Sequence, residues 1–466
     1  MSSSYDYDVL IIGGGPAGQT LSKKLIKAGK KVALVEKKYL GGTCLNEGCV
    51  PTKAFVSSVK LYEKIKKASR FGVNTQDPQI DWSTVLSRKN QIVESQRKAV
   101  GKELKTLGVD IFTPAIAKIT DSHRVEIVGV DSGEKQSVTT SYIVIATGSL
   151  NKDILGVDHK GILNSSSILN ILSIPQSLAI IGGGVIGIEF ANIFATLGTR
   201  VTVLEQLDHI LPLEDEEVSR DLAKLLTRKK IKFELGVRVN GVRYRDSSDE
   251  SSPVIVEYSD KSIEVDKVLI SVGRTPNTKN LWNDGVNILK DERGFIRVNS
   301  TYQTSIDNIF AIGDTIPTVA LAHVASMEAS VVGDFILGKN PLVLDYSKVP
   351  SCVYTSPEIA SIGKKEESLK EEGVSYKVVK CLLSTCIKST IEGDRDGYIK
   401  ILCSPDGTRL FGVHILGTGA TEMISDASVS MNSNMDLKSL GRCIRPHPTV
   451  GEALGEAFIE AGSSYQ

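Results

Sequence analysis

The pattern of apolar and polar positions predicts a parallel βαβ unit at the start of the chain. An apolar run of strand type at residues 7–12 leads into the glycine-rich turn GGGPAG at residues 13–18, and a helical pattern follows at 21–28. A second apolar strand at residues 32–35 ends on Glu36. A strand, a crossover helix and a strand in this order form a parallel sheet with the helix covering one face.

The same pattern returns in the middle of the chain. Apolar residues 178–181 lead into the turn GGGVIG at 182–187, then a helix to residue 197 and a strand at 200–204 that ends on Glu205. The first glycine of the turn and the closing acid lie 23 positions apart in both copies. The chain therefore contains an internal repeat of one βαβ unit rather than a short-period solenoid.

The segments around the repeat predict the rest of an α/β fold. Residues 54–107 have helical, amphipathic patterns, residues 110–148 have the pattern of short strands, and residues 200–272 alternate strands with one helix at 215–229. After residue 346 the pattern changes to alternating strands with a few helices, which predicts a separate C-terminal α+β domain. At roughly 150 residues per domain, the chain is long enough for about three domains.

Composition narrows the class of protein. Lys and Arg together number 55, as do Asp and Glu, so the formal net charge is zero, and hydrophobic residues make up 41%. These values are typical of a globular protein and give no reason to expect nucleic acid or a membrane as a partner. The sequence has no pattern of a transmembrane helix, signal peptide or transit peptide, and its scattered cysteines suggest reduced thiols. We therefore expect a cytoplasmic protein.

The glycine turns indicate two dinucleotide sites. In a G-x-G-x-x-G turn between strand and helix, the backbone N–H groups and the helix N-terminus bind a pyrophosphate, and the acid after the next strand binds a ribose 2′-hydroxyl. One glycine motif is weak evidence because glycine turns are common, but here the full order occurs twice. At the second site the carboxylate of Glu205 would repel the 2′-phosphate of NADP, and residues 206–209 bring no Arg or Lys, so NAD(H) is favoured.

Two cysteines five positions apart, Cys44 and Cys49, follow the first unit. They could be two buried thiols, metal ligands or a redox disulfide, although no second Cys or His pair follows at zinc-finger spacing. A regular helix would separate them by roughly 7.5 Å along its axis, more than the Cα distance of about 7 Å that a disulfide tolerates. A bridge therefore requires a distorted turn, which Gly48 and Pro51 favour, and a strained bridge is easily reduced. Lys53 would share a helix face with Cys49 and offer positive charge to a thiolate.

A third signal lies near the C-terminus, in the segment HPTVGE at residues 447–452. A single His in a turn is most often a surface residue. Together with a candidate dithiol elsewhere, however, His447 oriented by the carboxylate of Glu452 is what deprotonation of a thiol needs.

With these residues in view, the sequence resembles the FAD-dependent pyridine nucleotide-disulfide oxidoreductases, nearly from end to end. The cysteine segment and the His/Glu ending are highly specific together, whereas the glycine turns are less so. Besides these, the motifs that carry the resemblance are ATG at 146–148, GRTPN at 273–277, FAIGD at 310–314 and VYTSPE at 353–358.

The resemblance implies two Rossmann-like dinucleotide-binding domains plus a C-terminal α+β dimerisation domain. The implied boundaries are 1–150 for the first part of the FAD-binding domain, 151–275 for the NAD-binding domain, 276–345 for the second part of the FAD-binding domain, and 346–466 for the dimerisation domain.

The resemblance also implies the cofactors FAD and NAD, no metal, and a homodimer in which His447 and Glu452 of one subunit complete the cysteine site of the other. Lys53 would lie near the flavin and pair with Glu189. The implied catalytic residues are Cys44, Cys49, His447, Glu452, Lys53 and Glu189. Those implied for FAD are Gly13, Gly15, Gly18, Glu36, Lys37, Gly42, Thr43, Lys53, Ala117, Thr147, Gly148, Asp314 and Ala322. Those implied for NAD are Gly182, Gly184, Val185, Gly187, Glu189, Glu205, Gly273 and Arg274.

Within the family, the segment 321–323 and a C-terminal tail without a cysteine pair are most similar to the branch that oxidises protein-bound dihydrolipoamide with NAD⁺. That branch implies the lipoyl domains of 2-oxoacid dehydrogenase or glycine cleavage complexes as partners. The alternative is an NAD(P)H-dependent reductase of another disulfide. A flavoprotein that binds FAD and NAD but has a sensing or structural role is a rival from a different class. It predicts that Cys44→Ser leaves the function intact.

Overall fold

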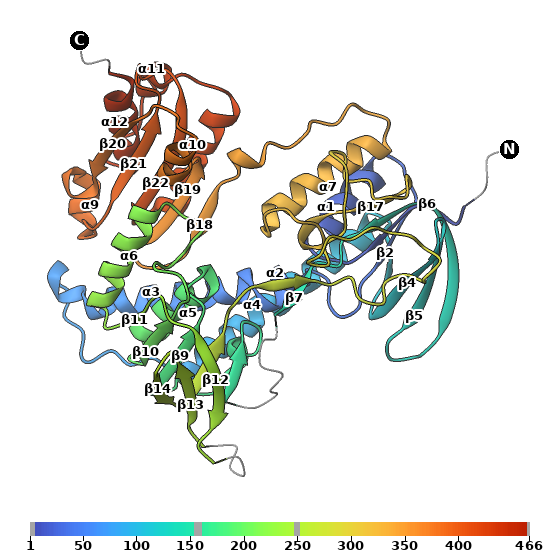
Figure 1. Cartoon of the computed structure of the whole chain (residues 1–466), viewed down its shortest axis with the longest axis horizontal. Helices are drawn as coiled ribbons and strands as arrows, with labels where there is room; N and C mark the ends of the chain where they lie inside the picture. Colours follow the sequence, from blue (N-terminus) through green and yellow to red (C-terminus); the bar gives the residue numbers. More distant parts are fainter. Residues whose placement is uncertain (1–4, 153–160, 247–251, 464–466) are drawn as a thin grey trace. The chain divides into compact units, whose positions relative to one another are not determined.

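The computed structural model describes residues 5–152, 161–246 and 252–463, and Figure 1 shows its elements. The chain divides into two compact units. The first consists of Met1–Ala54, Ser83–Lys152 and Gly273–Leu344, and the second of Phe55–Trp82, Asp153–Val272 and Asp345–Gln466. No helix within the described ranges is long and apolar enough to cross a membrane.

The first unit is built on a parallel sheet. Its strands pair in the order β3 (Asp110–Phe112), β2 (Val32–Val35), β1 (Tyr7–Ile12), β6 (Lys135–Ile145) and β17 (Ile309–Ala311). Val9, Leu10 and Ile11 in β1 are fully buried, as expected of a parallel strand covered on both faces. Helices α1 (Pro16–Lys27) and α7 (Ala322–Ile336) pack side by side in this unit (Figure 1).

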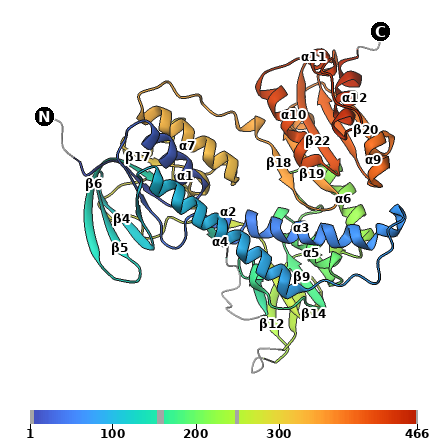
Figure 2. The same ribbon diagram turned by 180° about the vertical axis from the view of Figure 1, so that it is seen from behind.

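An antiparallel layer continues from β6. Strands β4 (Ala115–Asp121) and β5 (Arg124–Gly129) pair with each other, and β5 pairs with the first half of β6, as the turned view of Figure 2 shows. Strand β7 (Ser149–Asn151) pairs with β16 (Arg274–Pro276). The helices between β2 and β3 are α2 (Gly42–Glu47), α3 (Cys49–Lys66) and α4 (Trp82–Thr106).

The second unit repeats the parallel sheet. Its strands pair in the order β11 (Lys232–Glu234), β10 (Arg200–Leu204), β9 (Ser177–Ile181), β15 (Lys267–Ile270) and β8 (Ile162–Asn164). Helix α5 (Val185–Thr196) connects β9 to β10, and helix α6 (Glu216–Arg228) connects β10 to β11. Strands β12 (Val239–Tyr244), β13 (Val254–Tyr258) and β14 (Lys261–Val265) form an antiparallel sheet. The predicted repeat of the βαβ unit is thereby confirmed.

The end of the chain folds as an antiparallel sheet with helices, as predicted. The strands pair in the order β18 (Ser351–Val353), β19 (Glu358–Gly363), β22 (Leu410–Gly417), β21 (Tyr398–Cys403) and β20 (Lys377–Leu382). The helices of this part are α8 (Glu366–Glu371), α9 (Ile387–Glu392), α10 (Ala420–Asn432), α11 (Leu437–Gly441) and α12 (Gly451–Gly462), drawn in orange and red in Figure 2. The apolar faces of α10, α11 and α12 form one core with the sheet.

A row of polar side chains crosses this C-terminal sheet. Residues directly opposite each other on neighbouring strands share a face of the sheet. The row, in strand order, consists of Ser351, Ser361, His414, Lys400 and Lys380. It faces the acidic residues before and at the start of α6, where the ion pair of Lys400 with Asp215 is fully buried. We call these five residues the polar row.

The histidine of the polar row predicts a pH-dependent stability. His414 is 1% exposed, its Nε2 lies 3.0 Å from the carbonyl oxygen of Lys364, and its Nδ1 has no hydrogen-bond partner among the described residues. Because a carbonyl only accepts, Nε2 carries the proton of the neutral ring. Burial lowers the pKa of His414 below 6.5. Below about pH 6.5 the unfolded chain therefore binds more protons than the folded chain does. The contribution of the neutral His414 to the free energy of unfolding is complete above about pH 6.5 and is lost as the pH falls below that value.

We expect the free energy of unfolding of the holoprotein to fall more steeply between about pH 7.5 and about pH 5.5 in the wild type than in His414→Gln. One proton accounts for at most about 1.4 kcal/mol per pH unit. Urea titrations at a series of pH values measure both slopes. Two parallel curves would show that His414 does not titrate on unfolding.

Candidate functional site

The first glycine turn is fixed by close approaches. A Cβ on Gly18 would lie 2.0 Å from the carbonyl oxygen of Gly13, so α1 can start this close to β1 only with glycine at that position. Glu36 follows β2, and its Oε2 accepts a hydrogen bond from Gly14 N at 2.8 Å. Its Oε1 accepts one from Lys38 N, also at 2.8 Å. The acid that closes the βαβ unit therefore faces the glycine turn.

The second glycine turn repeats these contacts. A Cβ on Gly187 would lie 2.1 Å from the carbonyl oxygen of Gly182. Glu205 follows β10, and its Oε2 accepts a hydrogen bond from Gly183 N at 2.6 Å. The two copies of the repeat thus place an acid against a glycine turn in the same way.

The helices that follow the two turns have open N-termini. Gly15 and Gly184 are the N-cap residues of α1 and α5. Among the residues that the structure describes, no side chain caps either helix, and neither helix has an acid in its first turn. A Cβ built on Gly184 would have no described atom within 4 Å. Free N–H groups at the positive end of a helix bind phosphate groups. The two turns therefore fit the pyrophosphates of two dinucleotides such as FAD and NAD, and Val185 is the first residue of α5.

The cysteine segment begins on the first glycine turn. Gly41 N donates a hydrogen bond to Gly14 O at 2.8 Å. A Cβ on Gly42 would lie 2.7 Å from Gly15 Cα, so this approach also requires glycine. Helix α2, with Thr43 in its first turn, therefore starts directly beside the N-cap of α1.

Cys44 and Cys49 lie on two helices separated by one irregular residue. Helix α2 ends at Glu47, Gly48 has φ −146° and ψ −109°, and α3 begins at Cys49. This is the distorted turn that the sequence predicts as the condition for a bridge. In the structure the Cys44 side chain is half-buried and Cys49 is exposed.

The electrostatics of the segment show that the two thiols interact. A hydrogen bond with Cys49 raises the pKa of the Cys44 thiol, and burial and the negative charge of Cys49 raise it further. The positive charge of Lys53, one helical turn after Cys49, acts in the opposite direction. A negative charge on Cys49 therefore favours the protonated form of Cys44. Within the described ranges, no group of three or more His, Cys, Asp and Glu side chains is placed to hold a metal ion.

Asp314 lies just after β17, at the edge of the parallel sheet where the first glycine turn also lies. Its Oδ2 accepts a hydrogen bond from Ser149 Oγ at 2.6 Å, and Ser149 Oγ accepts one from Arg274 Nε at 2.7 Å. Burial lowers the pKa of Arg274. The negative charges of Asp314, Glu47 and Cys49 act in the opposite direction and raise it. The structure thus groups Gly273 and Arg274 with the first unit, and their roles toward NAD stay predictions.

The remaining residues predicted for FAD also belong to the first unit. Thr147 Oγ1 donates to Asn277 O at 2.7 Å, and Asn277 N donates to Gly148 O at 2.8 Å. Ala322 begins α7, a helix without a side-chain cap or an acid in its first turn in the described chain. Ala117 is buried in β4, whereas Lys37 is exposed. Contacts of these residues with FAD stay predictions.

The predicted pair His447 and Glu452 is formed in the second unit. Glu452 lies in the first turn of α12, and its Oε1 is 2.9 Å from His447 Nδ1. A backbone hydrogen bond from Thr449 and the bond from His447 hold the pKa of Glu452 below its usual value. Because the carboxylate accepts from Nδ1, the free lone pair is on Nε2, and the side chain of His447 is 69% exposed. His447 can therefore accept a proton from a molecule that arrives from solvent.

Glu189 is buried on α5, and its Oε1 accepts a hydrogen bond from Tyr354 N at 3.0 Å. Its predicted partner Lys53 belongs to the other unit, so that pair stays a prediction.

Glu328, a buried acid on α7, is a further residue near the predicted FAD site that was not expected from the sequence. Its Oε2 accepts a hydrogen bond from Gly313 N at 2.6 Å, and its Oε1 accepts one from Thr318 Oγ1 at 2.8 Å. Glu328 therefore holds the turn that carries Asp314. The available signal was an acid among the apolar residues of the segment that forms α7.

Comparison with protein families gives two matches that together cover most of the chain. The family model described as pyridine nucleotide-disulphide oxidoreductase matches residues 7–329. The model of the dimerisation domain of pyridine nucleotide-disulphide oxidoreductases matches residues 349–458.

Curated relatives match over nearly the whole chain. A protein of Bacillus subtilis (strain 168) named dihydrolipoyl dehydrogenase is 36% identical, and the match covers 98% of each chain. A protein of Arabidopsis thaliana named dihydrolipoyl dehydrogenase 2, mitochondrial, is 37% identical, over 98% of this chain and 91% of the relative.

Solved structures share the fold. The HOCl-induced flavoprotein disulfide reductase RclA from Escherichia coli, as a Cu(II) complex, superimposes with a TM-score of 0.88 at 28% identity, over 98% of this chain and 100% of that chain. LpdA from Mycobacterium tuberculosis superimposes with a TM-score of 0.90 at 23% identity, over 97% of this chain and 99% of that chain, a likeness in fold.

Proposed function

Because the chain belongs to the pyridine nucleotide-disulphide oxidoreductase family, we propose that it is a FAD-dependent dihydrolipoamide dehydrogenase. It oxidises protein-bound dihydrolipoamide to lipoamide and reduces NAD⁺ through a disulfide of Cys44 and Cys49. The observation that carries this proposal is that α2 starts beside the first glycine turn, where Gly41 N donates a hydrogen bond to Gly14 O. Both thiols follow within eight residues of Gly41. The relatives named dihydrolipoyl dehydrogenase support the choice of substrate.

The proposed assembly is a homodimer, which the match to the dimerisation domain supports. In it, His447 and Glu452 of one subunit complete the cysteine site of the other. Lipoyl domains of 2-oxoacid dehydrogenase or glycine cleavage complexes deliver the substrate. The domain boundaries and the cytoplasmic location stay as the sequence predicts them.

The first step of the proposed mechanism is a proton transfer. His447 Nε2 accepts the proton of one substrate thiol, and the carboxylate of Glu452 stabilises the charged ring through Nδ1. Only the thiolate is a good nucleophile, so this transfer starts the reaction.

The second step is thiol–disulfide exchange. The substrate thiolate attacks Cys44 Sγ, the bond to Cys49 breaks, and Cys49 leaves as a thiolate whose charge Lys53 offsets. The sulfur of the second substrate thiol then attacks the substrate sulfur bound to Cys44, and lipoamide forms. The proton of that thiol passes to Cys44 as the mixed disulfide breaks. Two protons and two electrons have then reached the protein, with one proton on His447 and the other on Cys44. The raised pKa of Cys44 agrees with that final state.

The two glycine turns complete the proposed chemistry. When bound, FAD carries the electron pair from the dithiol on to NAD⁺. The protein holds the two pyrophosphates at the open N-termini of α1 and α5.

A substrate panel tests this function. Purified, FAD-loaded protein should form NADH from dihydrolipoamide and NAD⁺. In the reverse direction, with NADH, it should reduce lipoamide faster than glutathione disulfide or Hg²⁺ by about two orders of magnitude or more. Preference for a different disulfide would instead support the alternative, a reductase for another substrate.

The position of Glu205 predicts the choice of nicotinamide cofactor. We expect Glu205→Gln to narrow the preference for NAD⁺ over NADP⁺, measured as the ratio of kcat/KM values, by about tenfold, or about 1.4 kcal/mol. The reason is that the amide keeps a hydrogen-bond acceptor for Gly183 N but no longer repels a 2′-phosphate. Glu257→Gln, in β13, is the control and should leave the ratio unchanged. An unchanged ratio in Glu205→Gln would contradict this role.

A further inference from the structure

We propose that Glu214 is a positioning residue for the second glycine turn and thereby sets the affinity for NAD⁺. Glu214 is held by the polar row of the C-terminal sheet, and it acts through Leu211 on Gly183. This inference rests on the function proposed above, because it takes the second glycine turn as the NAD⁺ site.

The contact with the glycine turn comes from a strained residue. Leu211 N donates a hydrogen bond to Gly183 O at 2.8 Å. Leu211 has φ +51°, in the left-handed region, and is 1% exposed. This conformation is unfavourable for a leucine and persists only where its surroundings hold it. The backbone of the nucleotide turn is therefore bonded to a residue that other contacts must keep in place.

Those contacts come from the segment that follows Leu211 and from Lys365. Its carbonyl oxygen accepts hydrogen bonds from Glu214 N at 2.9 Å and from Ser219 Oγ at 3.2 Å. Lys365 Nζ donates to the neighbouring Pro212 O at 3.1 Å. These hydrogen bonds fix the loop between β10 and α6 at residues 211–214, just before α6 begins.

The side chain of Glu214 is anchored in the C-terminal sheet. It is 2% exposed, and its two oxygens accept hydrogen bonds from Ser351 Oγ at 2.7 Å and from Ser361 Oγ at 2.5 Å. Both serines belong to the polar row, on β18 and β19. A buried carboxylate is stable only with such donors, so the sheet fixes the position of Glu214.

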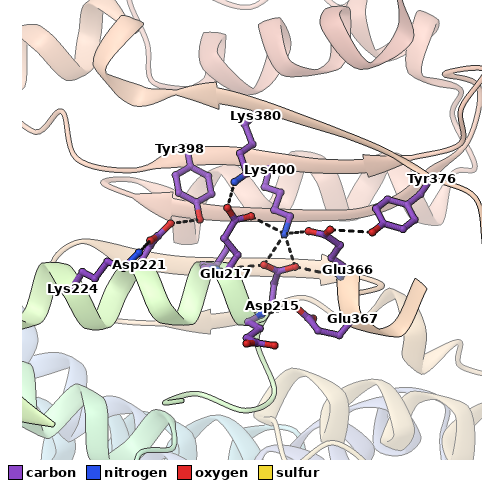
Figure 3. A network of polar contacts seen from close by, with 12 residues as sticks. Asp215, Glu217, Asp221, Lys224, Glu366, Glu367, Tyr376, Lys380, Tyr398 and Lys400 are labelled. Carbon is purple, nitrogen blue, oxygen red and sulfur yellow. Dashed lines mark hydrogen bonds and ion pairs between the residues drawn. The ribbon is translucent and has the colours of Figure 1, made fainter. Parts of the chain in front are cut away.

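Asp215, the residue after Glu214, holds the start of α6 independently of Glu214. Asp215 caps α6, because its Oδ1 accepts from Val218 N, and it binds the buried Lys400 at 2.9 and 3.0 Å. Figure 3 shows Lys400 between the carboxylates of Asp215, Glu217 and Glu366. Loss of the Glu214 side chain therefore leaves this ion-pair cluster in place and frees chiefly the loop that carries Leu211.

The expected consequence is specific to the nucleotide. Once Leu211 is free to leave its strained conformation, the carbonyl oxygen of Gly183 loses its partner. The adjacent backbone N–H groups of the turn are then no longer fixed for a pyrophosphate. The dithiol on α2 and α3 has no part in these contacts, so the affinity for dihydrolipoamide should not change.

The test compares two substitutions of Glu214 with one control in the holoprotein. Glu214→Ala should raise the KM and the Kd for NAD⁺ about tenfold, with kcat and the KM for dihydrolipoamide within about twofold of the wild type. Glu214→Gln should restore the affinity, because an amide can exchange hydrogen bonds with both serine hydroxyls. Tyr398→Phe removes the hydrogen bond of Tyr398 to Asp221 between the same sheet and α6, and it should lower the melting temperature without changing the KM for NAD⁺.

If Glu214→Ala does not fold, Ser351→Ala takes its place in the test. This substitution removes one hydrogen-bond donor to Glu214 at a half-buried position, and it should raise the KM for NAD⁺ by about threefold. An unchanged affinity for NAD⁺ in the folded Glu214 or Ser351 variant, with only a lower melting temperature, would overturn the inference and leave the proposed function standing. An equal loss of affinity in Tyr398→Phe would also overturn it. A wild-type protein that does not bind NAD⁺ would overturn the proposed function and the inference together.

Discussion

Cys44→Ser is expected to abolish NADH formation from dihydrolipoamide, with a loss of at least about 10⁴-fold. Serine cannot form the disulfide with Cys49, and its hydroxyl is not ionised at neutral pH, so neither the oxidised state nor the exchange step exists in the variant. Steady-state assays with saturating dihydrolipoamide and NAD⁺ measure the loss. Reduction of an artificial dye by NADH should survive, because that reaction bypasses the disulfide.

The matched control for this substitution is Cys443→Ser, since Cys443 is an exposed free thiol on the C-terminal part of the chain. It should keep wild-type activity. If Cys44→Ser keeps more than a small fraction of the dihydrolipoamide activity, the dithiol does not carry the electrons. A flavoprotein with a sensing role would then describe the protein better.

His447→Gln has the second-largest expected effect, a loss of about 10²–10⁴-fold in kcat/KM for dihydrolipoamide. Glutamine can still donate a hydrogen bond to Glu452, but it cannot accept the thiol proton at the position of Nε2. The remaining rate should rise with pH, because the substrate thiol must then ionise in solution. Assays over a range of pH measure both effects.

Two comparisons separate the role of His447 from a general loss of structure. Dye reduction with NADH should be unchanged in His447→Gln, and His123→Gln, in the first unit, should keep wild-type activity in both assays. An equal loss of dihydrolipoamide oxidation and dye reduction in His447→Gln would contradict its role as the base.

The local parts of the site could be predicted from the sequence because they are encoded in short segments. The glycine turns, the acids Glu36 and Glu205, and the break in the helix at Gly48 each follow from residues within one strand–turn–helix segment. His447 and Glu452 are five positions apart, so their hydrogen bond could also be predicted.

The parts that could not be predicted depend on contacts between distant segments. Glu328 bonds Gly313 across 15 positions, and Ser361 bonds Glu214 across 147. A hydrophobic pattern gives the buried face of an element but does not give its polar partners. The position of Arg274 likewise depends on the pairing of β16 with β7, which groups it with Asp314 in the first unit.

Mapping the thiols before and after reduction tests the central claim most directly. The oxidised holoprotein is mixed anaerobically with one equivalent of dihydrolipoamide and denatured, and its thiols are then alkylated and identified by mass spectrometry. Two thiols should become reactive only after reduction, and they should be Cys44 and Cys49. An unchanged thiol count, or new reactivity at other cysteines such as Cys381 and Cys386, would contradict the transfer of electrons through this pair.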